Sequence, residues 1–193
     1  MRVMNFLIIS GARCGSSSLQ KAIARYYNLK IIFEPFSPWG VQRKKFTYQN
    51  IIVKTILHQI KGKAPKYGSI TSSHFDECFD FYSQLIPKFE KVILLTRENE
   101  IEHAESIAAL QSGNDFEMKY VYDLKIDLEP IINDLIIEKN YIKKLGNHFN
   151  LPIDTYESIY YGDGIKDRDI SLDYSFIDTK NKLRQTSVNK TLL

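Results

Sequence analysis

Short apolar runs alternate with amphipathic segments along this chain of 193 residues. The runs at residues 5–10, 30–36, 50–56 and 91–96 are rich in Ile, Val and Leu, and they predict strands. The run at 91–96 is apolar throughout, as expected of a strand buried on both faces. Residues 151–159 predict a further, late strand.

Helices are predicted where apolar residues recur every three or four positions, at residues 19–27, 75–89, 97–113 and 127–149. In the first of these, Leu19, Ile23 and Tyr26 share one face, and Asp127 can cap the last. Strands that alternate with helices indicate an α/β fold, in which helices cover both faces of a parallel sheet. Neither an internal repeat nor a linker divides the chain, so residues 1–193 predict a single domain.

Composition narrows the class of protein. Apolar residues make up 44% of the chain and charged residues 25%, which is typical of globular proteins and excludes a disordered or collagen-like chain. No apolar run reaches the roughly 18 residues that span a bilayer, so no membrane partner is expected. Cys14 and Cys78 do not form a disulfide framework, and we expect a cytoplasmic protein.

Charge is distributed unevenly between the two parts of the chain. Residues 1–75 contain twelve Lys or Arg and a single acid, Glu34, for a net charge of +11. Residues 76–193 carry a net charge of −8. This asymmetry indicates that the first part meets an anion, which could be a phosphorylated cofactor, an anionic substrate or a nucleic acid.

The segment GARCGSSS (residues 11–18) joins the first predicted strand to the first predicted helix. A Gly/Ser-rich turn at a helix N-terminus offers backbone N–H groups that bind phosphate or sulfate. Arg13 adds a charge, and Ser16, Ser17 and Ser18 add hydroxyl groups. A Walker A loop requires Lys where Ser16 stands, and a cysteine phosphatase requires Arg where Gln20 stands. Cys14 has no evident base beside it, which argues against a nucleophile.

Arg97 directly follows the apolar run at 91–96. Enzymes that transfer phosphoryl groups with magnesium usually have a metal-binding Asp at such a position. An arginine there can bind an anion directly through its fork of donors. Ser106, nine residues further on, could join Arg97; the alternative is a pairing of Arg97 with Glu98, Glu100 or Glu102.

These motifs together resemble the sulfotransferases that use 3′-phosphoadenosine 5′-phosphosulfate (PAPS), and carbohydrate-type and bacterial members more than cytosolic aryl members. The first motif resembles the family's 5′-phosphosulfate loop, and Arg97 with Ser106 resembles its 3′-phosphate motif. FEPF (33–36) and TYES (155–158) resemble two further segments of the family. The chain departs from many members in having Glu-Asn after Arg97, and it lacks the Gly-x-x-Gly-x-x-Lys segment of cytosolic members.

The resemblance implies a P-loop-NTPase-like three-layer fold with a central parallel sheet flanked by helices. It implies transfer of a sulfuryl group from PAPS to a hydroxyl or amine of a glycan or small-molecule acceptor, which leaves PAP and needs no metal. Arg97 and Ser106 would bind the 3′-phosphate. Lys182 and Arg184 in the basic tail would contact the nucleotide. The loop positions that would hold the phosphosulfate are Arg13, Cys14, Gly15, Ser16, Ser17 and Ser18.

The acceptor needs a general base. Glu34 is the first candidate, because it lies at the end of the second strand and matches the family's catalytic Glu. His74, which stands 23 residues before Arg97, is the second, ahead of His58. Lys54 could touch the leaving phosphate or the acceptor.

An acceptor pocket could be lined by Phe36, Trp39, Tyr48 and the basic residues 43–45.

Two other functions are alternatives to a sulfotransferase. A P-loop nucleotide kinase is disfavoured by Ser16 and Arg97. A binder of nucleic acid or another polyanion is supported by the basic first part alone, so no nucleic-acid partner is expected.

Overall fold

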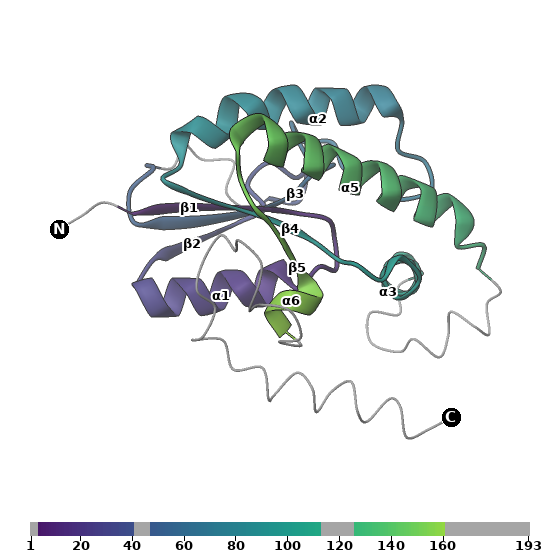
Figure 1. Ribbon diagram of the computed structural model, residues 1–193, viewed down its shortest axis with the longest axis horizontal. Helices are drawn as coiled ribbons and strands as arrows, with labels where there is room; N and C mark the ends of the chain where they lie inside the picture. The colour runs from purple at the N-terminus through teal and green to yellow at the C-terminus, as the bar shows by residue number, and fades with distance from the viewer. Residues whose placement is uncertain (1–3, 41–46, 113–125, 161–193) are drawn as a thin grey trace, which may run out of the picture.

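The computed structural model describes residues 4–40, 47–112 and 126–160. Its five strands form one sheet in the order β2-β3-β1-β4-β5, and every pair of neighbouring strands is parallel (Figure 1). The strands are β1 Asn5–Ser10, β2 Lys30–Phe33, β3 Ile51–Ile56, β4 Lys91–Thr96 and β5 Ile153–Thr155. The predicted α/β fold, with a central parallel sheet between layers of helices, is confirmed.

Helices form the outer two layers. They are α1 Ser16–Tyr27, α2 Ser72–Leu85, the 3-10 turn η1 Ile86–Lys88, α3 Glu100–Gln111, α5 Glu129–Phe149 and α6 Tyr156–Tyr160. Figure 1 shows α1 and α6 below the sheet, α2 and α5 above it, and α3 beyond the carboxyl end of β4. Because all strands are parallel, their carboxyl ends meet at one edge of the sheet, where ligands of such folds bind.

Strand β1 shows why the apolar runs are continuous. Its side chains alternate between the two faces of the sheet, and both faces are covered. Leu7 and Ile9 pack into the core that includes α2 and α5. Phe6 and Ile8 pack into the second core, with Leu19 of α1. Each core therefore takes every second residue of β1.

The late strand is shorter than predicted, since only Ile153–Thr155 pairs with β4 and a helix begins at Tyr156. The reason is a cap between Thr155 and Ser158. Ser158 N donates to Thr155 Oγ1 at 3.1 Å, and Thr155 N donates to Ser158 Oγ at 3.1 Å. Each of these two N–H groups thus has a side-chain acceptor, which favours a helix over a longer strand.

Two other helix predictions need correction. Tyr26 does not share the buried face of α1 with Leu19 and Ile23, because it is 63% exposed. The last helix has Leu128 and not Asp127 at its N-cap, although Asp127 Oδ1 accepts the Glu129 N–H at 3.0 Å.

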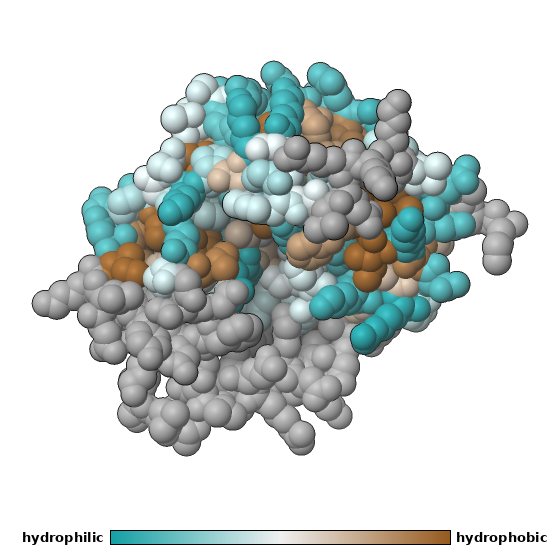
Figure 2. Space-filling view, turned by 180° about the vertical axis from the view of Figure 1, so that it is seen from behind, coloured by the Kyte–Doolittle hydropathy of each residue, from teal (hydrophilic) through white to brown (hydrophobic). Residues whose placement is uncertain are grey.

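Among the described residues, Figure 2 shows hydrophilic residues interspersed with groups of apolar residues on this face. Among the described residues, no helix combines the length and apolar character that crossing a bilayer requires.

Candidate functional site

The first loop (residues 11–15) connects β1 to α1 at the carboxyl edge of the sheet. Arg13 and Gly15 adopt left-handed backbone conformations, with φ of 59° and 73°. Gly15 is the N-cap of α1 and makes no side-chain capping bond, so it blocks none of the N–H groups of the first turn. A Cβ at Gly15 would lie 2.7 Å from a ring carbon of Tyr160 and 2.9 Å from ring carbons of Tyr156. Glycine is therefore required here by both conformation and space.

The three serines of the loop motif are not equivalent. Ser16 is buried, Ser17 is half-buried and Ser18 is exposed. The N–H groups of Ser18 and Leu19 both donate to Gly15 O at 3.1 Å, which closes the first turn of α1. Ser16 and Ser17 thus begin the helix, where an anion would meet the positive end of its dipole.

A hydrogen bond joins the two anion motifs of the sequence. Arg13 Nε donates to Ser106 Oγ at 2.9 Å, although the two residues are 93 positions apart. Ser106 was expected to join Arg97, and instead it holds the arginine of the first loop. Helix α3 therefore presents its serine to the loop between β1 and α1.

Arg97 follows β4 and has acidic partners. Its Nη2 donates to Glu102 Oε2 at 3.0 Å, and its Nε lies 3.9 Å from Glu157 Oε1. The guanidinium also lies over the ring of Tyr156, 5.0 Å from the centroid. The sequence named Glu102 among three possible partners but did not indicate Glu157, whose carboxylate also accepts the Glu98 N–H at 2.9 Å.

Arg97 Nε is buried and has no hydrogen-bond partner among the described residues, although Glu157 Oε1 lies 3.9 Å from it. A buried N–H without an acceptor costs free energy, so it marks a place where an external acceptor would be stabilised.

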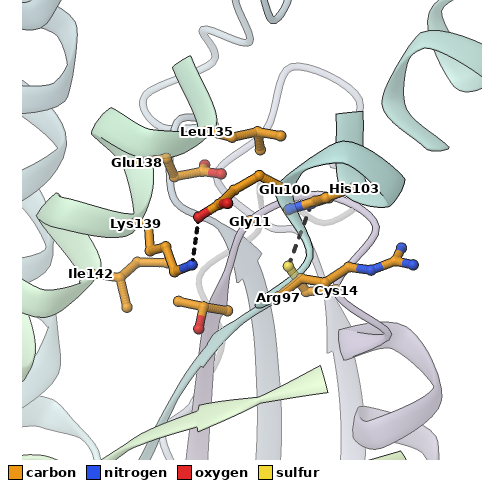
Figure 3. Close-up of a pocket in the computed structure, with 10 residues that line it drawn as sticks. Gly11, Cys14, Arg97, Glu100, His103, Leu135, Glu138, Lys139 and Ile142 are labelled. Atoms are coloured by element: carbon orange, nitrogen blue, oxygen red, sulfur yellow. Dashed lines mark hydrogen bonds and ion pairs between the residues drawn. The ribbon is translucent and has the colours of Figure 1, made fainter. Parts of the chain in front are cut away.

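A pocket connects Arg97 with the first loop (Figure 3). In Figure 3 Lys139 faces Glu100, with Nζ donating to Oε1 at 2.9 Å, and the Arg97 guanidinium points away from Glu138. The pocket has about 260 Å³ of empty space, solvent at its mouth included. The lining residues are Gly11, Cys14, Thr96, Arg97, Glu100, His103, Leu135, Glu138, Lys139 and Ile142.

Glu34 and Lys54 are brought together at the same edge of the sheet. Glu34 directly follows β2 with a left-handed φ of 41°, and Lys54 lies in β3 opposite Phe33. Lys54 Nζ donates to Glu34 Oε1 and lies 4.4 Å from the centroid of the Phe33 ring. Burial lowers the pKa of Lys54, and the charge of Glu34 opposes that effect. The side chain of Glu34 remains 15% exposed and that of Lys54 only 4%, so Glu34 is the member of the pair that solvent reaches.

The two histidine candidates have structural partners. His74 Nε2 donates to His58 O at 2.7 Å, and His58 Nδ1 donates to Glu138 Oε1 at 3.0 Å. Both side chains are buried. Because Nε2 of His74 donates to a carbonyl, only Nδ1 of this side chain could accept a proton, and His74 is 8% exposed.

The aromatic residues expected around an acceptor do not gather into one pocket. Phe36 packs against Phe81, with ring centroids 5.0 Å apart. Tyr48 lies at the amino end of the sheet, where its carbonyl accepts from Asn5 Nδ2 at 3.1 Å, and so it cannot face the loops at the carboxyl ends. Trp39 is 67% exposed. The basic residues 43–45, and Lys182 and Arg184, lie outside the described residues.

Cys14 has a histidine beside it that the sequence did not reveal. Its Sγ lies 3.7 Å from His103 Nε2 (Figure 3). That nitrogen donates to Ala12 O at 2.6 Å and so cannot take the thiol proton. Burial, reinforced by the charge of Glu138, raises the pKa of Cys14 well above its usual range. A raised pKa lowers the fraction of thiolate, which is the reactive form of a cysteine.

Sequence reasoning also missed Glu138 of α5, which lies under the first loop. A Cβ at Gly11 would lie 2.6 Å from Glu138 Oε2. Its carboxylate accepts from Tyr67 and His58, and the side chain is 2% exposed. The one local signal was Gly11, whose missing side chain leaves room for this carboxylate.

Comparisons with known proteins add little to this geometry. No protein-family model matches the chain, and no curated protein matches it. A solved structure of the YorR protein from Bacillus subtilis, in complex with phosphorylated GDP, is similar over 98% of this chain and 99% of its own. The identity is 11% and the TM-score is 0.41. A likeness of this strength carries no argument about a ligand or an activity.

Proposed function

We propose that this protein is a sulfotransferase that moves a sulfuryl group from PAPS to a hydroxyl or amine of a glycan or small-molecule acceptor. The observation that carries the proposal is the hydrogen bond between Arg13 and Ser106, with Arg97 beside the same loop. Two motifs that are far apart in sequence thereby bring Arg13 and Arg97 to the start of α1. Such a site suits a ligand that carries anionic groups at two points.

Arg97 is the residue that would bind the 3′-phosphate of PAPS. Arg97 offers a buried Nε–H that has no acceptor among the described residues. Its Nη2 is held by Glu102, whose side chain is 49% exposed and can turn toward solvent. A phosphate oxygen would take the place of the Glu102 carboxylate and give Arg97 a bidentate partner.

The remaining loop residues would serve the other anionic end of the donor. The N–H groups at the start of α1, with the Ser16 and Ser17 hydroxyls and the charge of Arg13, would bind the sulfate and the leaving phosphate. PAPS supplies the sulfuryl group, whose bond to the phosphate oxygen breaks as the acceptor oxygen bonds to sulfur. The protein's task is to orient both ends and to stabilise negative charge on the leaving oxygen.

Glu34 is the proposed general base and would take the proton of the attacking acceptor. In the structure the carboxylate of Glu34 forms an ion pair with Lys54. Proton transfer to Glu34 would leave the buried ammonium of Lys54 without its counter-charge.

Ligand-dependent unfolding separates this proposal from a P-loop kinase. PAP without metal should raise the free energy of unfolding by about 2.7 kcal/mol at 100 times its Kd, and EDTA should not change the effect. ATP with Mg²⁺ and oligonucleotides should stabilise less. Stronger stabilisation by ATP with Mg²⁺ would replace the sulfotransferase with a kinase, and stronger stabilisation by oligonucleotides would favour a polyanion binder.

A further inference from the structure

The backbone of Ala12, in the first loop, is held on both sides by side chains from distant parts of the chain. Its N–H donates to the Tyr67 hydroxyl at 3.1 Å. Its carbonyl accepts from His103 Nε2 at 2.6 Å. The first bond orients the peptide between residues 11 and 12, and the second orients the peptide between 12 and 13. Together they restrict both backbone dihedrals of Ala12.

The hydroxyl of Tyr67 is itself held in one orientation. It donates to Glu138 Oε2 at 2.8 Å, so its lone pairs remain available for the Ala12 N–H. Burial, with the charge of Glu138, raises the pKa of Tyr67 well above its usual range, so the hydroxyl keeps its proton. Glu138 is fixed in turn by His58, whose Nδ1 donates to its other oxygen at 3.0 Å.

The restricted residue directly precedes Arg13. A φ of 59° at Arg13 is uncommon for a residue with a side chain, and something outside the residue must maintain it. In this conformation Arg13 Nε donates a hydrogen bond to Ser106 Oγ. If Ala12 were free to rotate, Arg13 could relax to an ordinary backbone conformation and lose that contact.

We propose that Tyr67, oriented by Glu138, is a positioning residue that holds the first loop in the shape that binds an anion. Tyr67 does not line the pocket beside the first loop. Its hydroxyl accepts the Ala12 N–H and so fixes the orientation of that peptide, which keeps the guanidinium of Arg13 at the site. The part of the proposal that concerns PAP rests on the proposed function, whereas the part that concerns the loop does not.

The chain offers a matched pair of substitutions, Tyr67→Phe and Tyr82→Phe. Tyr82 is fully buried on α2, and its hydroxyl also has two partners, Thr55 Oγ1 at 2.8 Å and Ile56 O at 3.0 Å. Neither of those partners belongs to the first loop. Both variants remove the same atom from a buried site, so a general loss of stability should affect them alike.

The decisive measurement is hydrogen exchange of the Ala12 amide in the ligand-free protein, followed by NMR. Loss of its acceptor should speed exchange about tenfold in Tyr67→Phe, and Tyr82→Phe should leave it unchanged once global stability is matched. The Kd for PAP should rise about tenfold in Tyr67→Phe alone.

Unchanged Ala12 exchange in Tyr67→Phe, or equal acceleration in both variants, would overturn the role of Tyr67. An unchanged Kd for PAP in Tyr67→Phe would overturn it as well. If the unmodified protein does not bind PAP, the proposed function is wrong, and the exchange comparison still decides whether Tyr67 holds the loop.

Discussion

Glu102 competes with the proposed ligand for Arg97, and this competition can be measured. In the ligand-free protein Arg97 Nη2 donates to Glu102 Oε2 at 3.0 Å, and the side chain of Glu102 is 49% exposed. A 3′-phosphate must displace that carboxylate before it can take both donors of the guanidinium. Glu102→Gln should therefore tighten binding of PAP, whereas Arg97→Ala should weaken it.

The magnitudes follow from the burial of the partners. Breaking an exposed ion pair costs about 0.2–1 kcal/mol, so Glu102→Gln should lower the Kd for PAP by roughly 1.4- to 5-fold. Arg97 is only 12% exposed, and losing its charged hydrogen bonds to the phosphate should cost about 1.5–3 kcal/mol, or roughly 10- to 150-fold in Kd. Adenosine 5′-phosphosulfate lacks the 3′-phosphate, so its Kd should change by no more than about twofold in Arg97→Ala.

Isothermal titration of the variants with both nucleotides tests these values. Glu77→Gln is the control, because it removes one negative charge from α2 instead of α3. Glu77 also has an ion-pair partner, since its Oε2 lies 2.9 Å from Lys63 Nζ. It should leave both Kd values unchanged. Equal losses for PAP and adenosine 5′-phosphosulfate in Arg97→Ala would show that Arg97 supports the structure and does not recognise a 3′-phosphate. Weaker PAP binding in Glu102→Gln would show that Glu102 is no competitor.

Three further predictions concern the base, the loop and pH. Glu34→Gln should keep PAP binding and lower turnover by about 10²–10⁴-fold in a sulfuryl-transfer assay, while His74→Ala leaves turnover nearly unchanged; the reverse pattern would reassign the base. Gly15→Ala should destabilise more than Gly62→Ala in urea unfolding, because both have positive φ but Gly62 has no atoms within 4 Å of the added Cβ; equal losses would contradict the clash. The pKa of Cys14 is raised in the folded protein, so stability is full below about pH 9 and falls above it, by up to about 1.4 kcal/mol per pH unit, as the unfolded thiol ionises. Cys14→Ser should remove this part of the alkaline loss, and identical pH curves would contradict it.

Much of the fold could be predicted because its signals are local. The apolar run at β4 Lys91–Thr96 reports burial on both faces, and the Gly/Ser-rich segment reports a tight turn before a helix. The late strand was overestimated because the reciprocal cap between Thr155 and Ser158 outweighs the β-propensity of the residues between them. Periodicity alone could not separate the exposed Tyr26 from the buried Leu19 on the same helix.

The sequence by itself determined which chemistry gathers at the site. A loop with Arg13 before Gly15, and a buried strand that ends in Arg97, indicate an anion because residue type and position suffice for that inference. The tertiary structure alone decided which groups touch. Arg13 lies 93 residues from its partner Ser106, and Tyr67 lies 71 residues from Glu138. Such contacts depend on the order of parallel strands and on how helices cross the sheet. Strand order and helix packing leave no local trace in the sequence, apart from a residue such as Gly11 that must stay small.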